Sequence, residues 1–178
     1  MSGDATKFNV TGQLPALKRY ARSLTRDESE AEDLVHDAVV RAYEGRDSFR
    51  TDGDLKSWLF SVLHNSFISG MRSRKAQRAR LDRAAKLADT EVRPEQEDRL
   101  RLAQISAAFL TLPVEQREAL HLVAIEGMSY GEAAQVLGVP IGTLMSRLGR
   151  ARSALRALEG ETNVVSLKLV RGRRDDKR

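Results

Sequence analysis

The chain has 178 residues, of which 41% are hydrophobic, 31% charged and only 5% aromatic, a globular composition. It contains no cysteine, which excludes disulfides, thiolate chemistry and cysteine-bound zinc. It also lacks the run of about 18 apolar residues that a membrane span needs, and residues 1–10 lack a secretory apolar core. We therefore expect a cytoplasmic protein without membrane contact, and a net charge of +5 that suits a polyanionic partner.

Apolar residues at helical spacing predict a first helix from Gln13 to Leu24. After a polar turn, a second helix is expected from Ser29 to Tyr43, with Asp27 or Ser29 as its N-cap. Its acidic first turn suits the positive end of a helix dipole, and Gly45 ends it. Its apolar stripe consists of Leu34, Val35, Ala38, Val39 and Ala42.

The opposite face of this second helix is negative. A protein that only binds DNA gains nothing from acids there, whereas a protein partner with a basic surface would be attracted. Dipole complementarity on a solvated face is an equally open alternative. The acids are Glu30, Glu32, Asp33, Asp37 and Glu44, beside the exposed aliphatic Val40.

Residues 46–54 form a polar loop, and Asp54 is a good N-cap for a third helix. Trp58 could stack on an unpaired base, but its place on the apolar stripe favours the core. Asn65 can bond adenine, and cations that follow one helix match a line of phosphates; a solvated basic face is the alternative. The apolar residues are Leu55, Trp58, Leu59, Val62, Leu63, Phe67 and Ile68, and the cations are Arg72, Arg74, Lys75, Arg78, Arg80, Arg83 and Lys86.

Helical periodicity fails over residues 87–97, which predicts a flexible linker. The fold class is therefore all-α, with one small helical domain over 10–86 and another over 98–158. Helices of the second domain are expected at about 97–110, 114–126, 129–137 and 141–158, with a Ser129–Glu132 capping box. Residues 159–178 form a basic tail whose Val-rich alternation predicts either an added strand or a docking segment.

Residues 129–156 have the pattern of a helix-turn-helix: a short capped helix, a turn containing Gly138, and a longer helix. One face of the longer helix is apolar, and the other carries side chains that can bond bases or phosphates in the major groove. A helical hairpin with a solvated basic face is the alternative. The candidate DNA-reading residues are Thr143, Ser146, Arg147 and Arg150.

Three stretches in this order resemble the extracytoplasmic-function family of sigma factors, with a slight leaning to its alphaproteobacterial general-stress members. Residues 30–42 are similar to the helix with which that family grips the polymerase clamp. Residues 55–65 with the basic run resemble its promoter-melting helix. Residues 112–120, 126–134 and 137–152 together resemble its second DNA-binding domain, so the two predicted domains correspond to sigma domains 2 and 4.

The resemblance implies a role for each set of residues and three partners: core RNA polymerase, promoter DNA and an anti-sigma factor. The loop over 46–54, with Asn65, Arg72, Arg74 and Lys75, would hold the opened minus-ten strand, and the helix-turn-helix residues would read the minus-35 duplex. His36 and Met145 depart from the family, which usually has Gln and a basic residue there. The clamp contacts would be Asp33, Leu34, Asp37 and Arg41.

Other classes of function explain fewer of these features. A stand-alone helix-turn-helix regulator accounts for residues 129–156 but leaves the acidic and basic helices without a purpose. A sigma mimic that sequesters an anti-sigma protein would not need Arg147 or Arg150. An enzyme would need a convergent site, yet His36, His64 and His121 are scattered and no nucleophile motif appears. We therefore expect no catalytic residue, no metal and no cofactor.

Overall fold

The computed structural model describes residues 8–49, 53–81 and 105–162, and within these ranges every regular element is a helix. The predicted linker, the start of the helix expected at 97 and residues 163–178 of the predicted tail lie outside the described residues, as do the side chains of 74–81 and 158–162. The helix expected to end at 158 continues to Thr162, into the predicted tail. In chain order the elements are η1 (Thr11–Gln13), α1 (Leu14–Thr25), α2 (Glu28–Glu44), η2 (Arg46–Ser48), α3 (Leu55–Leu81), a helix over 105–111, α5 (Val114–Leu120), η3 (His121–Ile125), α6 (Tyr130–Leu137) and α7 (Ile141–Thr162).

Helices α1, α2 and α3 form an N-terminal unit. The Asp27 carboxylate caps α2 by accepting a 2.8 Å hydrogen bond from the Glu30 amide, which settles the choice between Asp27 and Ser29. Asp54 caps α3 as predicted, accepting from the Ser57 amide at 2.9 Å. Apolar side chains from all three helices meet in the core, including Leu17, Tyr20, Val35, Ala38, Phe60 and Leu63.

The helices from residue 105 onward form a C-terminal unit that contains the predicted helix-turn-helix. The capping box between Ser129 and Glu132 is present, and α6 ends at Gly138 in the left-handed conformation, with φ at 62°. The single helix expected over 114–126 changes at His121 into a π-helical turn, closed by a 3.0 Å bond from the Glu126 amide to the His121 carbonyl. A 3.6-residue apolar period cannot reveal such a local widening.

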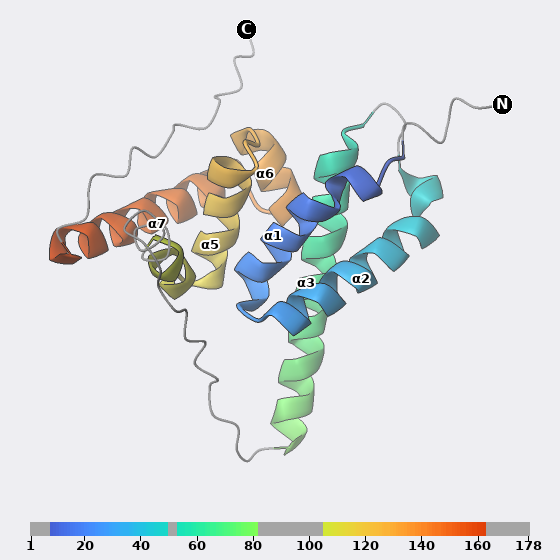
Figure 1. Cartoon of the computed structure of the whole chain (residues 1–178), viewed down its shortest axis with the longest axis horizontal. Coiled ribbons are helices and arrows are strands. Elements are labelled where there is room, and N and C mark those ends of the chain that lie inside the picture. Colours follow the sequence, from blue (N-terminus) through green and yellow to red (C-terminus); the bar gives the residue numbers. More distant parts are fainter. Residues whose placement is uncertain (1–7, 50–52, 82–104, 163–178) are drawn as a thin grey trace, which may run out of the picture.

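The two units pack against each other. Figure 1 shows α1–α3 on one side and α5–α7 on the other, and α3 contacts α6 while α1 contacts α5. The Tyr20 and His121 rings meet across this junction with their centroids 5.2 Å apart. The hydrophobic core is therefore continuous from one unit to the other.

Candidate nucleic-acid interface

The N-terminal half of α7 presents the predicted DNA-reading side chains. Leu144, Leu148, Ala151 and Leu155 are at most 4% exposed, so the predicted apolar face is the packed face. Thr143, Ser146 and Arg150 are exposed on the rest of the helix. This leaves their polar groups available to a groove of duplex DNA.

Arg147 lies differently from the other three predicted readers. Its side chain is only 20% exposed, and its Nη1 atom donates a 2.8 Å hydrogen bond to Oε1 of Glu118 on α5. The other carboxylate oxygen of Glu118 lies 3.5 Å from Nδ1 of His64, which belongs to α3 of the N-terminal unit. Arg147 is thus hydrogen-bonded to an acid, Glu118, that lies buried between the two units.

Burial governs the charge of this group. It raises the pKa of Glu118 to about 7, against the opposing effect of the Arg147 cation. Burial, together with a smaller effect of the Arg147 cation, lowers the pKa of His64 to about 4. The Tyr20 hydroxyl lies 3.5 Å from the same His64 nitrogen, and burial followed by the Glu118 charge raises the pKa of Tyr20. Near neutral pH, His64 is therefore uncharged while Glu118 is partly protonated.

The residues predicted to hold single-stranded DNA lie along α3. Asn65 and Arg72 are exposed, whereas the side chains of Arg74 and Lys75 lie outside the described part of that helix. Trp58 is half-buried and packs against the core, as its place on the apolar stripe indicates. Its ring lies 5.9 Å from Phe8 and 5.3 Å from Phe49, centroid to centroid.

A hollow of about 430 Å³ lies where the polar loop before α3 faces the helix-turn-helix. Its wall combines Phe49, Asp54 and Trp58 from the N-terminal unit with Glu132 and Gln135 from α6. Of the loop predicted to hold the minus-ten strand, residues 46–49 and 53–54 are described. In this arrangement the hollow is shared between the two units.

The residues predicted to contact polymerase follow one line along α2. Asp33, Asp37 and Arg41 recur every four residues and are exposed, and Leu34 beside them is half-buried. Two large apolar side chains are also exposed on this helix: Val40 is 42% exposed and Tyr43 is 51% exposed. This surface combines charge with uncovered apolar area.

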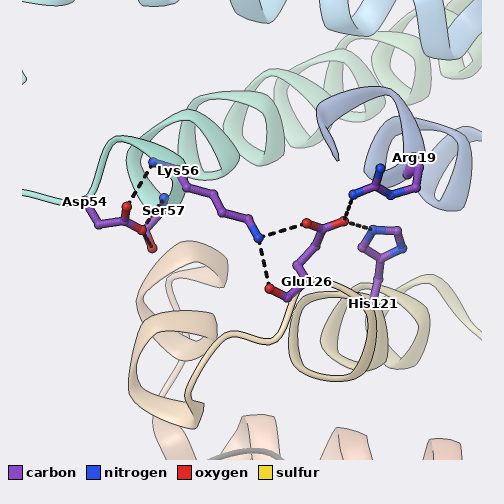
Figure 2. A network of polar contacts seen from close by, with 6 residues as sticks. All are labelled: Arg19, Asp54, Lys56, Ser57, His121 and Glu126. Atoms are coloured by element: carbon purple, nitrogen blue, oxygen red, sulfur yellow. Dashed lines mark hydrogen bonds and ion pairs between the residues drawn. The ribbon is translucent and has the colours of Figure 1, made fainter. Parts of the chain in front are cut away.

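Sequence reasoning missed a cluster of charges around Glu126, which Figure 2 shows between the two units. Lys56 Nζ lies 3.0 Å from Glu126 Oε2 and donates a 2.9 Å hydrogen bond to the Glu126 carbonyl oxygen. Arg19 Nη2 lies 3.1 Å from Oε1, and His121 Nε2 lies 3.4 Å from the same oxygen. The one available signal was an acid at the C-terminal end of a helix, where the dipole disfavours it.

Glu126 stays ionised although its side chain is only 2% exposed. Burial by itself raises its pKa, but the hydrogen bonds from His121 and Lys56, the Lys56 charge and Arg19 together lower it to about 2. Burial lowers the pKa of His121, and the Glu126 carboxylate opposes this. The ionised acid is therefore stabilised both by His121 of its own unit and by two cations of the other unit, Lys56 and Arg19.

A second missed contact is made by Arg117 of α5, which is 2% exposed. Its guanidinium donates to two carbonyl oxygens in the last turn of α1, those of Ser23 and, at 3.0 Å, Leu24. A cation at the C-terminal end of a helix satisfies unpaired carbonyls and complements the dipole. In return, Arg26 of the N-terminal unit donates a 3.0 Å bond to the Leu112 carbonyl.

Neither a metal site nor a membrane span is found within the described ranges. No group of three His, Cys, Asp or Glu side chains there could hold a metal ion. Among the same residues, no helix has the length and hydropathy to cross a bilayer. What the described surface offers is charge and hydrogen-bonding capacity along α2, α3 and α7.

The family models and two relatives that match this chain are all sigma factors. The chain matches the family models Sigma-70 region 2 over residues 10–77 and Sigma-70, region 4 over residues 102–155. It is 38% identical over 156 residues to the ECF RNA polymerase sigma factor EcfG of Rhodopseudomonas palustris, and the aligned residues make up 87% of this chain and 85% of EcfG. It is 36% identical over 148 residues to the ECF RNA polymerase sigma factor SigM of Mycobacterium tuberculosis, covering 83% of this chain and 73% of that one.

Two solved structures are similar over most of the chain. The sigma factor RpoE in complex with the anti-sigma factor NepR from Bartonella quintana matches with a TM-score of 0.77 and 37% identity, covering 89% of this chain and 98% of the other. CnrH in complex with the cytosolic domain of CnrY matches with a TM-score of 0.63 and 33% identity, covering 90% and 92%.

Proposed function

Because the chain belongs to the extracytoplasmic-function family of RNA polymerase sigma factors, we propose that it binds core RNA polymerase and directs it to a specific class of promoters. The observation that carries this proposal is the helix-turn-helix of α6 and α7, whose apolar face is buried while Thr143, Ser146 and Arg150 stay exposed. Family members are transcription initiation factors, and we assign the chain no catalytic activity and no cofactor.

Promoter recognition is divided between the two units. Thr143, Ser146, Arg147 and Arg150 read the minus-35 duplex, where arginine can bond guanine through two hydrogen bonds. On α3, Asn65 contacts the opened minus-ten strand, and the cations Arg72, Arg74 and Lys75 follow its phosphates. Extracting a base from the stack costs a few kcal/mol, which such contacts can offset.

Polymerase binding is assigned to Asp33, Leu34, Asp37 and Arg41 of α2. The exposure of the three charged residues and the half-buried state of Leu34 support this assignment. A charged line beside uncovered apolar surface suits a protein partner better than it suits DNA. Since polymerase and promoters are cytoplasmic in bacteria, the chain acts in the cytoplasm.

We also assign an anti-sigma factor as a partner. The relatives RpoE and CnrH have been solved with the anti-sigma factor NepR and with the cytosolic domain of CnrY, respectively. Large apolar side chains exposed on both units of this chain offer area for such a protein. They are Val40, Tyr43, Ile125, Ile141 and Met145.

Run-off transcription tests the proposal. The purified chain is added to core polymerase with a library of promoters, and we expect transcripts from a subset that shares minus-35 and minus-ten elements. Tight binding to duplex promoter DNA without polymerase, combined with no stimulation of transcription, would instead identify a stand-alone regulator.

A further inference from the structure

We propose that Met145, with Ile141 one helical turn before it, selects a thymine in the minus-35 element by packing against the 5-methyl group of that base. This inference rests on the proposed function and deepens it, because it names a base that the helix-turn-helix prefers. The observation that carries it is an exposed apolar pair among the polar side chains of the DNA-reading helix.

The apolar pair lies in the N-terminal half of α7. Ile141 is 49% and Met145 is 51% exposed, whereas Leu144 and Leu148 on the packed face are at most 1% exposed. Residues four apart on a helix are neighbours on its surface, so the two exposed side chains form one patch. Among the described residues, neither of them packs against the hydrophobic core. Packing within the described chain therefore does not account for this patch.

The patch is continuous with the predicted DNA-reading surface. Ser146 follows Met145 in the chain and is exposed, as are Thr143 and Arg150 on the same half of the helix. The N-terminal residues of a recognition helix are the ones that reach base edges in the major groove. Duplex DNA is therefore the partner that the position of Met145 favours.

Two glycines leave the backbone beside Met145 bare. Gly142 precedes Met145 by three residues and Gly149 follows it by four, so both lie next to it on the helix surface. A Cβ atom added at either glycine would meet nothing within 4 Å, and neither has a positive φ. Glycine destabilises a helix interior relative to alanine, but it lets a ligand come close to the backbone. Close approach of a base pair at Met145 is thus sterically open.

Thymine is the base that presents an apolar group in the major groove. Its C5-methyl group lies there beside one acceptor, whereas the edges of adenine, guanine and cytosine present hydrogen-bond donors and acceptors. The Met145 and Ile141 side chains cannot replace the water on those polar edges, so covering them costs free energy. Against a methyl group the same side chains bury apolar area, which is favourable. Met145 therefore prefers thymine at the position that it covers.

Deoxyuridine isolates this contact, because it differs from thymidine only in lacking the 5-methyl group. The DNA is a promoter that run-off selection with the wild-type chain identifies. Each thymine of its minus-35 element, on either strand, is replaced singly by deoxyuridine. The affinity of the complete holoenzyme, which is core polymerase with the full chain, is then measured for each duplex.

Three variants accompany the wild-type chain. Met145→Gln keeps the length of the side chain but makes its end polar, and Met145→Leu keeps it apolar. The matched control is Ile125→Ala, since Ile125 is also 51% exposed but lies outside α7. Because Met145 and Ile125 are both exposed, all three substitutions should leave the fold intact, and circular dichroism checks this.

We expect one thymine at which loss of the methyl group weakens wild-type binding by about three- to fivefold, the effect of burying one methyl group. At that position Met145→Gln should bind the thymidine and deoxyuridine duplexes equally well. Met145→Leu and Ile125→Ala should keep the discrimination. The readout is a ratio of two affinities of the same protein, so it does not depend on the active fraction of a variant.

The inference is overturned if the wild-type holoenzyme is insensitive to the methyl group of every thymine in the element. It is also overturned if Met145→Gln keeps the wild-type ratio, which would leave the apolar pair to a protein partner such as the anti-sigma factor. Failure of the proposed function looks different, because the wild-type chain would then select no promoter at all.

Discussion

The guanidinium of Arg147 donates a 2.8 Å hydrogen bond to the carboxylate of Glu118, so a residue predicted to read DNA is also part of the packing between α5 and α7. Glu118 is 4% exposed, and among the described residues Arg147 is the one cation paired with its carboxylate. The His64 ring, 3.5 Å away, is neutral near pH 7. Arg147 therefore has a structural role in this arrangement, whatever it does on DNA.

Removing the Arg147 charge should lower stability. In Arg147→Met the buried Glu118 loses its partner, and we expect the free energy of unfolding to fall by about 1–3 kcal/mol. Chemical denaturation at neutral pH measures this. Arg150→Met is the matched control, since Arg150 is exposed on the same helix, and it should change stability by less than about 0.5 kcal/mol. Equal stability of the two variants would contradict the structural role.

Substitution of the predicted readers should alter promoter choice. Arg150→Ala and Arg147→Ala are each expected to relax the minus-35 preference at one base pair, by about 1–3 kcal/mol. Run-off transcription on a library with a randomised minus-35 element measures the change, and Arg156→Ala, farther along the exposed side of α7, is the control. An unchanged preference in both variants would show that these residues do not read bases.

Removing an acid from α2 should weaken binding to polymerase and leave promoter preference unchanged. Asp37→Ala is expected to weaken binding to core polymerase by about 1–2 kcal/mol, with the order of preferred promoters unaltered. Glu115→Ala, which removes an exposed acid of α5 that is assigned no role in binding, is the control. Fluorescence titration against core polymerase gives the affinities. If the two variants bind equally well, the assignment of Asp33, Asp37 and Arg41 to the polymerase clamp is wrong.

His64 and Glu118 should make opposite contributions to stability between pH 4 and 7. Glu118 has its pKa raised to about 7 in the fold, so the folded chain binds the extra proton and this contribution grows as pH falls from 7 to about 4.5. His64 has its pKa lowered to about 4, so the unfolded chain binds the extra proton and stability is lost as pH falls from about 6.5 to 4. In the wild-type chain the two effects largely cancel.

Single substitutions should uncover each effect. Glu118→Gln should lose stability on acidification from pH 6.5 to 4, whereas His64→Gln should gain it from pH 7 to 4.5, each by up to the order of 3 kcal/mol. Denaturant unfolding of the three chains at a series of pH values measures both slopes. Parallel profiles would mean that neither group titrates away from its ordinary range.

The sequence by itself determined most of the helices and the packed face of α7. The caps of the helices depend on neighbours within a few residues. Asp54 and the Ser129–Glu132 box were predicted, Asp27 was one of two candidate caps, and Gly138 was placed just past the end of its helix. The apolar stripe of α7 follows from the 3.6-residue period, so its burial could be predicted too. The roles of residues on α2, α3 and α7 in binding polymerase and DNA stay predictions.

Only the tertiary structure decided which charges meet. Glu126 binds Arg19 and Lys56, and Glu118 meets both Arg147 and His64, through partners that lie far apart in the chain. Helical periodicity describes which face of a helix is apolar, but it carries no information on which other helix covers that face. The pairing of distant charges depends on how the two units pack, because an ion pair forms only where the fold brings both groups within a few ångströms.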